Sequence, residues 1–271
     1  MQSFDKYYIS PDGTKIFYDL HLQNTNTCLI FLHGIAGDLT AWNKIRQNIE
    51  NGSYSTIGID LRGHGYSQVP KTTGPYSIDL FANDVIGILK MERFKKYVLV
   101  GHSLGGMIAI FLAENYLDLI SKIVLIDTSY KIPGHLKWLK GVVGLDKIFN
   151  FIEKISPSWK LKFRKNYLDL AENSDITLKR FLLDLSHSSL KTIVSTAQGI
   201  IDFDASEKLK SIKTPTLILA GNKDIFYDMS EEVDLASKIN NSKIKIFPDL
   251  SHICIIEDPK SVSDEILKFL D

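Results

Sequence analysis

The sequence predicts an α/β protein with a mostly parallel central sheet, helices on both of its faces and an inserted helical cap. Between residues 27 and 126, short apolar runs typical of buried strands alternate with segments whose apolar residues recur at helical spacing. This alternation indicates a parallel sheet, because crossover helices join consecutive parallel strands. It stops near residue 130 and resumes after residue 210. We therefore expect a core formed by residues 1–129 and 211–271, with residues 130–210 as the cap.

The N-terminal half of the core contains most of the predicted strands, which are residues 6–9, 15–22, 27–32, 54–59, 97–100 and 123–126. The turn sequence Ser10-Pro11-Asp12-Gly13 separates the first two and indicates a hairpin. A helix is expected over residues 39–50, with Asp38 as its N-cap, and a second one begins after Ser77. Both caps are short polar side chains that can accept from the first N–H groups of a helix.

The C-terminal half returns to the same alternation, with strands at residues 216–220 and 243–247 and a helix at 231–239 between them. A last helix begins at Pro259, since proline is favoured at the first helical position. In residues 130–210 no clear strand pattern is present, and prolines and glycines divide the stretch into several short helices.

Composition excludes several functional classes. The 271 residues carry 32 Lys and Arg against 32 Asp and Glu, so charge does not favour a nucleic-acid partner. No run approaches 18 apolar residues, and the N-terminus lacks the apolar region of a signal peptide. The two cysteines, Cys28 and Cys254, are too few for a disulfide framework, so we expect buried free thiols and a cytoplasmic protein.

The segment Gly101-His102-Ser103-Leu104-Gly105 carries the strongest chemical signal. It lies between a predicted strand and a predicted helix, which is the arrangement of a nucleophile elbow. Flanking glycines let the chain turn sharply, so that the serine hydroxyl stands above the sheet, and the helix directs its first N–H groups at that point. Ser103 is therefore the candidate nucleophile.

A serine becomes a useful nucleophile only when a base takes its proton. Active-site residues collect where parallel strands end, which favours His33, His64, His102 and His252 among the seven histidines. His102 is adjacent to Ser103, and adjacent side chains in the elbow point apart. His252 follows the last predicted strand and can reach Ser103, so we expect it to be the base.

The acid that orients the base should lie between the serine and the histidine in the chain. Asp224, in the turn Gly221-Asn222-Lys223-Asp224 after strand 216–220, is the first candidate. Asp127, at the end of strand 123–126, is the second. Either residue has a structural alternative, since turn aspartates often cap nearby amides.

Acyl transfer also needs hydrogen-bond donors for an oxyanion. The N–H of Leu104, at the start of the helix, is one candidate. The N–H of Ile35 is the other, because Gly34 allows an unusual backbone turn after strand 27–32. The structural alternative for that loop is a tight glycine turn with no donor role.

In these motifs the chain resembles the α/β-hydrolase superfamily, and specifically its cap-bearing esterases and lactonases. The ordered motifs are His33-Gly34, Asp60-Leu61-Arg62-Gly63-His64-Gly65-Tyr66-Ser67, Gly101-His102-Ser103-Leu104-Gly105-Gly106, Gly221-Asn222-Lys223-Asp224 and Ser251-His252. The resemblance implies that His64 belongs to a structural loop and that His33 shapes the oxyanion loop. Haloalkane dehalogenases and epoxide hydrolases of this fold have an aspartate where Ser103 stands, which disfavours their chemistry.

The combined expectation is a serine hydrolase that cleaves a carboxylic ester, lactone or thioester through an acyl-enzyme. Ser103, His252 and Asp224 form its triad, the Ile35 and Leu104 amides bind the oxyanion, and a small acyl compound is the substrate. No metal or organic cofactor is required. A carbon–carbon bond hydrolase acting on vinylogous diketones, and a ligand sensor with slow turnover, remain as alternatives.

The predicted cap differs from the core in charge. Residues 131–191 contain 12 Lys and Arg but only six Asp and Glu. A basic cap could attract an anionic substrate or carrier. The same excess is also typical of solvated faces on amphipathic helices.

Overall fold

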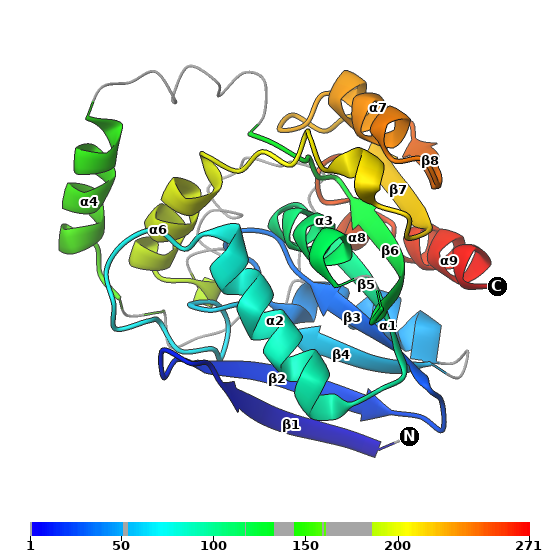
Figure 1. Ribbon diagram of the computed structural model, residues 1–271, viewed down its shortest axis with the longest axis horizontal. Helices are drawn as coiled ribbons and strands as arrows, with labels where there is room; N and C mark the ends of the chain where they lie inside the picture. Colours follow the sequence, from blue (N-terminus) through cyan, green and yellow to red (C-terminus); the bar gives the residue numbers. More distant parts are fainter. Residues whose placement is uncertain (1, 51–53, 117, 133–143, 159, 161–185) are drawn as a thin grey trace.

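The central sheet has the strand order β1-β2-β4-β3-β5-β6-β7-β8 in a computed structural model that describes residues 2–50, 54–116, 118–132, 144–158, 160 and 186–271 (Figure 1). The strands are β1 (Gln2–Ile9), β2 (Lys15–Leu22), β3 (Thr27–Leu32), β4 (Ser55–Ile59), β5 (Lys96–His102), β6 (Ile120–Ile126), β7 (Thr216–Gly221) and β8 (Ser242–Phe247). β2 runs antiparallel to both of its neighbours, and all pairs from β4 to β8 are parallel. The predicted fold class is therefore confirmed.

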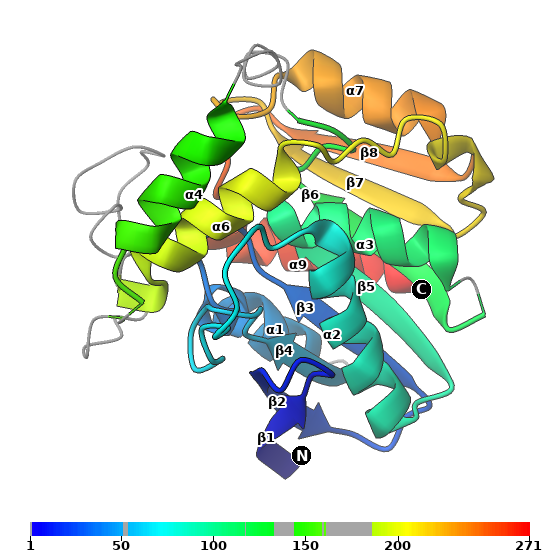
Figure 2. The ribbon, with the colours of Figure 1, turned by 60° about the vertical axis from the view of Figure 1, so that its left-hand side comes forward.

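Helices cover both faces of this sheet (Figures 1 and 2). One apolar cluster joins the sheet to α2 (Ile78–Glu92), α3 (Leu104–Asn115) and α7 (Met229–Lys238). A second cluster on the opposite face includes side chains of α1 (Asn43–Glu50), α8 (Cys254–Glu257) and α9 (Pro259–Leu270). Alternate residues of one strand enter different clusters: Leu99 faces the first, whereas Val98 and Val100 face the second. Burial on both faces explains the continuous apolar runs of the parallel strands.

The described part of residues 130–210 contains α4 (Leu145–Ile155) and α6 (Leu190–Ile200), which pack against each other (Figure 2). Tyr76 N–H donates to the Ser195 carbonyl over 2.8 Å, which docks α6 on the chain that follows β4. Residues 133–143, 159 and 161–185 of the predicted cap lie outside the described residues. The division into core and cap stays a prediction.

A buried pair connects the cap segment before α6 to the core. His187 hydrogen-bonds through Nδ1 to Asp38, and both side chains are fully buried. Asp38 also accepts from Thr40 N–H at 2.8 Å, which confirms it as an N-cap. The predicted helix over residues 39–50 is present, but its first turn, Leu39–Trp42, is a 3₁₀ helix that leads directly into α1.

Ser77 and the two cysteines complete the comparison with the predicted elements. Ser77 occupies the N-cap position of α2, but its side chain makes no capping hydrogen bond, contrary to the prediction. Its carbonyl instead accepts from the N–H groups of Leu80 and Phe81. Cys28 and Cys254 are buried free thiols, as predicted.

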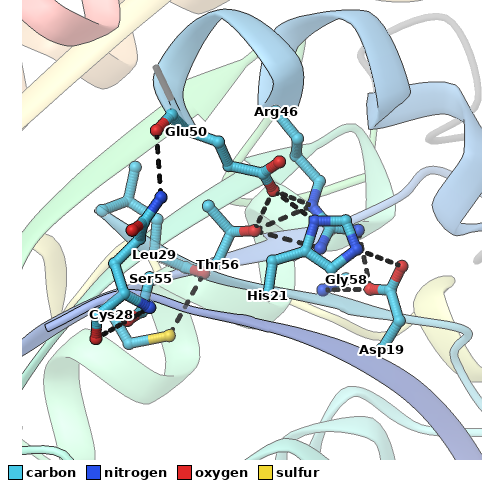
Figure 3. Close-up of polar contacts among 10 residues, drawn as sticks. Asp19, His21, Cys28, Leu29, Arg46, Glu50, Ser55, Thr56 and Gly58 are labelled. Carbon is cyan, nitrogen blue, oxygen red and sulfur yellow. Dashed lines mark hydrogen bonds and ion pairs between the residues drawn. The ribbon is translucent and has the colours of Figure 1, made fainter. Parts of the chain in front are cut away.

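A buried ionic network anchors α1 to the sheet (Figure 3). The Arg46 side chain is 2% exposed, and its Nη1 donates to Asp19 Oδ1 on β2 over 2.6 Å. Its Nε donates to Thr56 Oγ1 on β4 over 3.1 Å. Glu50 accepts from Thr56 and is 2.7 Å from His21 Nδ1. The guanidinium therefore balances two carboxylates that share its site.

Arg46→Met should lower the free energy of unfolding by about 3 kcal/mol, because removing one partner leaves buried carboxylates without their counter-charge. The penalty should shrink at low pH, where Glu50 takes up a proton; burial opposes its ionisation, but hydrogen bonds from His21 and Thr56 and the charge of Arg46 hold the pKa of this carboxyl below its usual value. Urea unfolding at pH 7 and pH 3.5 measures both effects. Lys44→Met, at an exposed position of the same helix, is the matched control. Equal losses in the two variants would contradict the role of the network.

Candidate active site

Ser103 occupies a sharp turn between β5 and α3. Its backbone has φ 51° and ψ −115°, outside the regions that L-residues favour. Its N–H donates to the Ile126 carbonyl at 3.0 Å, and its carbonyl accepts from Thr128 Oγ1 at 2.6 Å. A Cβ on Gly105 would lie 2.1 Å from the Leu32 carbonyl oxygen, so α3 approaches the sheet more closely than another residue would allow. The turn predicted from the sequence is present.

Asp224 and His252 form a direct contact at the same edge of the sheet. His252 Nδ1 is 2.8 Å from Asp224 Oδ2, and the two side chains are 11% and 2% exposed. Asp224 Oδ1 accepts from the N–H groups of Phe226 and Tyr227, at 2.7 and 3.1 Å. Since a carboxylate accepts, His252 Nδ1 carries the proton of this bond. In the neutral imidazole, Nε2 is then the nitrogen that accepts a proton.

His102 and Tyr227 bring this pair beside Ser103. His102 Nε2 donates to the His252 carbonyl over 2.7 Å, and the two rings are 4.9 Å apart. The Tyr227 ring lies 5.5 Å from the His252 ring. The Asp224–His252 pair therefore lies against His102, the residue that precedes Ser103.

The loop that carries His252 is itself fixed. Ser251 donates through Oγ and through its N–H to the Glu257 carboxylate, at 2.8 and 2.7 Å. A Cβ on Gly221 would lie 2.4 Å from the Ser251 carbonyl oxygen, so the loop lies directly on the end of β7. These contacts fix the loop, and with it the His252 side chain, relative to the end of β7.

The loop after β3 lies against Ser103. A Cβ on Gly34 would be 3.2 Å from Ser103 Cβ and 2.9 Å from His102 Nδ1, so glycine permits this approach. Two residues on, Ala36 has φ 63°, a left-handed conformation that is uncommon outside glycine. The half-buried Ile35 lies between them, and the N–H of Leu104 begins α3. Both predicted oxyanion donors are therefore in segments that border Ser103.

Two histidines hold this loop in place. His33 Nδ1 donates to the Gly34 carbonyl at 2.7 Å, while its Nε2 accepts from Leu61 N–H at 3.0 Å. His64 Nδ1 donates to the Arg62 carbonyl, and its Nε2 accepts from Ala36 N–H at 3.3 Å. Burial, together with the nearby His33, lowers the pKa of His64 well below its usual value. Both rings are neutral supports of the loop, as the resemblance implied.

Asp127, the second acid candidate, lies below the Asp224–His252 pair. It is fully buried at the end of β6, where Oδ1 accepts from Gly221 N–H at 2.7 Å and the carboxyl contacts Cys254. Burial raises its pKa to about 7, and the negative charge of Asp224 adds to this effect. Burial also raises the pKa of Glu232 well above its usual value, and the negative charge of Asp127 raises it further. Of the two candidates, the structure places Asp224 on the imidazole.

The sequence interpretation missed three of these contacts. It treated His102 only as a neighbour of the nucleophile, whereas the ring anchors the base loop. It did not identify Tyr227, which lies three residues after Asp224 and whose ring packs beside that of His252. It also missed Thr128, which bonds the Ser103 carbonyl and donates its N–H to Glu232.

The described residues contain neither a cluster of metal ligands nor a helix suited to a membrane. Within the ranges that the structure describes, no group of three or more His, Cys, Asp or Glu side chains is arranged to hold a metal ion. No helix in the same part of the chain is long and apolar enough to cross a membrane.

Comparison with known proteins identifies the family. The model of the alpha/beta hydrolase fold family matches residues 27–259, so the chain belongs to this family. A curated relative, 3-oxoadipate enol-lactonase 2 of Acinetobacter baylyi, is 25% identical over 95% of this chain and 94% of its own length. Epoxide hydrolase 1 of Caenorhabditis elegans is 22% identical over the whole chain and 71% of its own length. The chain spans 55% of the bovine protein ABHD8, at 26% identity.

Solved structures share the fold at low identity. The enol-lactonase from Burkholderia xenovorans has a TM-score of 0.75 at 22% identity, covering 98% of this chain and 99% of the other. The esterase from Exiguobacterium antarcticum has a TM-score of 0.76 at 20% identity, covering 98% and 99% of the two chains. The architecture of the core is therefore that of known α/β hydrolases.

Asp127→Asn should make stability less dependent on pH. Folding raises the pKa of this carboxyl from 3.8 to about 7, so its contribution to stability is present below pH 4 and is lost as pH rises toward 7. Asparagine keeps the acceptor for Gly221 N–H and never ionises. The difference in unfolding free energy between the variant and the wild type should therefore favour the variant more at pH 8 than at pH 4.5.

Unfolding free energies at the two pH values measure this difference. Asp249→Asn, at a side chain 84% exposed, is the control that should show no such trend. A constant offset between wild type and Asp127→Asn at both pH values would contradict the raised pKa.

Proposed function

We propose that this chain is a serine hydrolase that cleaves a carboxylic ester, lactone or thioester through a covalent acyl-enzyme. The observation that carries the proposal is the contact of 2.8 Å between His252 Nδ1 and Asp224 Oδ2, made beside a serine in a strained strand-to-helix turn. This set of groups is the one that acyl transfer by serine requires.

In the proposed reaction, Ser103 Oγ attacks the substrate carbonyl while His252 Nε2 takes its proton. Asp224 stabilises the imidazolium that forms, and His252 then gives the proton to the leaving group. The N–H groups of Ile35 and Leu104 donate to the oxyanion. His252 then takes a proton from a water molecule, which attacks the acyl carbonyl. As the acid is released, the His252 imidazolium gives its proton to Ser103 Oγ.

The known relatives support ester or lactone substrates more than other classes. An enol-lactonase is among the sequence relatives, and an enol-lactonase and an esterase are among the structural ones. The relative described as an epoxide hydrolase points elsewhere. Epoxide opening in this fold uses an aspartate nucleophile, and this chain has Ser103 at that position. A vinylogous diketone is the substrate that would reveal carbon–carbon bond cleavage instead.

Ser103→Ala should lower kcat for p-nitrophenyl esters by several orders of magnitude without unfolding the protein, because it removes the nucleophile. A fluorophosphonate probe should label the wild type at Ser103. Ser121→Ala, at the far end of β6, is the matched control and should keep both activity and labelling. Labelling at another serine, or near-normal activity of Ser103→Ala, would show that the nucleophile is wrong.

Asp224→Asn should lower kcat/KM far more than Asp127→Asn, because only Asp224 contacts the imidazole. In the wild type, kcat/KM should fall as the pH is lowered far enough to protonate the imidazole, since protonated His252 cannot act as a base. Steady-state kinetics of the three proteins from pH 5 to pH 9 test both statements. The reverse order of the two variants would assign the acid to the end of β6.

A further inference from the structure

His187 is a fully buried histidine to which the mechanism above gives no role. It lies on the segment that leads into α6, and its Nδ1 donates to the carboxylate of Asp38, which is also fully buried. A carboxylate only accepts, so the ring is the donor. The His187 carbonyl accepts from Gly65 N–H at 2.8 Å. The residue is therefore bonded to the core through its backbone and through its ring.

Asp38 directly follows the turn that carries the Ile35 N–H. The Gly34 carbonyl accepts from Gly37 N–H at 3.2 Å, which closes a turn of four residues with Ile35 and Ala36 at its centre. The φ of 63° at Ala36 is of the kind that a type II turn requires at its third residue. The turn thus has a defined shape, so the positions of its two ends set the direction of the Ile35 N–H.

The start of this Gly34–Gly37 turn lies on the proposed nucleophile. His33 Nδ1 donates to the Gly34 carbonyl at 2.7 Å, and a Cβ on Gly34 would be 3.2 Å from Ser103 Cβ. The turn is in close contact with Ser103 on that side. A displacement of its other end therefore rotates the Ile35 N–H relative to Ser103.

The end of the Gly34–Gly37 turn is held from two directions. Asp38 accepts from Thr40 N–H at 2.8 Å within its own loop, and it accepts from His187, 149 residues further along the chain. The next N–H, that of Leu39, donates to Asp60 on the core at 2.8 Å. The contact with His187 comes instead from the predicted cap. A residue of that segment thus helps to fix the end of the turn.

We propose that His187 is a positioning residue for the proposed oxyanion site, because its hydrogen bond to Asp38 fixes the end of the Gly34–Gly37 turn and thereby the direction of the Ile35 N–H. The inference rests on the proposed serine hydrolase activity and deepens it, since it makes the segment before α6 part of the catalytic geometry. An oxyanion donor lowers the barrier only when it is aimed at the oxygen on which charge develops. A small displacement of the turn therefore lowers kcat.

Other contacts hold α4 and α6 on the core at a different place. Glu153 on α4 accepts from Gly74 N–H at 3.1 Å, and the Ser195 carbonyl on α6 accepts from Tyr76 N–H at 2.8 Å. Both contacts reach the chain between β4 and α2. Loss of the His187 side chain therefore leaves these helices docked, so its effect on the rate can be separated from loss of the cap.

His187→Leu removes the donor and keeps an apolar side chain in the buried site. We expect kcat for p-nitrophenyl acetate to fall by about 10-fold, less than the roughly 100-fold loss that removal of a whole oxyanion donor causes, because the donor is displaced and not removed. KM should change by less than about threefold, since the interaction serves the transition state. The rate of fluorophosphonate labelling should fall in parallel, because phosphonylation of Ser103 also places negative charge on an oxygen that these donors bind.

His187→Asn is the rescuing variant. Its amide nitrogen is the same number of bonds from Cα as the histidine Nδ1 and can donate to Asp38. It should restore kcat and the labelling rate to within about threefold of the wild type. If the imidazole only filled space, the apolar leucine would serve as well as the polar asparagine or better. An asparagine variant as slow as the leucine variant would therefore contradict the role of the hydrogen bond.

Asp38→Ala removes the acceptor of the same hydrogen bond. It should lower kcat at least as much as His187→Leu, since the contact with Thr40 is lost too. Addition of His187→Leu to Asp38→Ala should lower kcat by less than about twofold further, because the contact between the two residues is already absent. Losses that multiply in the double variant would show that His187 does not act through Asp38.

Ser189→Ala is the matched control, because it weakens the same segment without touching Asp38. The buried Ser189 side chain is the N-cap of α6 and accepts from Thr192 N–H at 3.1 Å. This variant should lose thermal stability but keep kcat and the labelling rate. A His187→Leu variant that unfolds cooperatively, with kcat and labelling within twofold of the wild type, would overturn the proposal, and so would equal rate losses in Ser189→Ala. Failure of the serine hydrolase itself is a separate result, because the wild type would then show no labelling at Ser103.

Discussion

The close approach of α3 to the sheet is the constraint on which the site depends. The strained backbone at Ser103 costs on the order of 1–3 kcal/mol, a cost that persists only where the surroundings fix the conformation. The Ile126 carbonyl and the Thr128 hydroxyl supply two of the fixing hydrogen bonds. Gly105 and Gly101 supply the space, since a Cβ on either would lie within 2.4 Å of backbone oxygen. The sharp turn at Ser103 is therefore possible because Gly101 and Gly105, two residues away on either side, have no side chains.

Three carboxyl groups, those of Asp224, Asp127 and Glu232, lie close together behind the His252 imidazole, and their surroundings differ. Asp224 accepts hydrogen bonds from two backbone N–H groups and from His252 Nδ1–H. Asp127 and Glu232 are fully buried and have fewer donors, and both have raised pKa values. One ionised carboxylate beside the base is the arrangement that stabilises an imidazolium. A second ionised group at Asp127 would instead repel Asp224 and weaken the fold.

Much of this architecture could be predicted from the sequence, because the strands from β3 to β7 are buried on both faces and read as continuous apolar runs. The sharp turn at Ser103 and the Asp224–His252 contact were also accessible, since Ser103 directly follows β5 and the other two residues lie in the loops after β7 and β8. The 3₁₀ turn at Leu39–Trp42 could not be predicted, because helical periodicity does not distinguish a 3₁₀ start from an α-helix over one turn. The role of His102 could not be predicted either, because it depends on the carbonyl of a residue 150 positions further along the chain.

The histidines show why residue type alone does not identify a catalytic group. His33, His64 and His102 all follow strands near the site, and each has one ring nitrogen bonded to a backbone carbonyl. A neutral ring satisfies such a bond, and burial opposes its protonation, as the lowered pKa of His64 shows. His252 differs because the partner of its Nδ1 is a carboxylate, which gains strength when the ring becomes charged. His252, the proposed base, is thus distinguished from the neighbouring histidines by the carboxylate that its Nδ1 contacts.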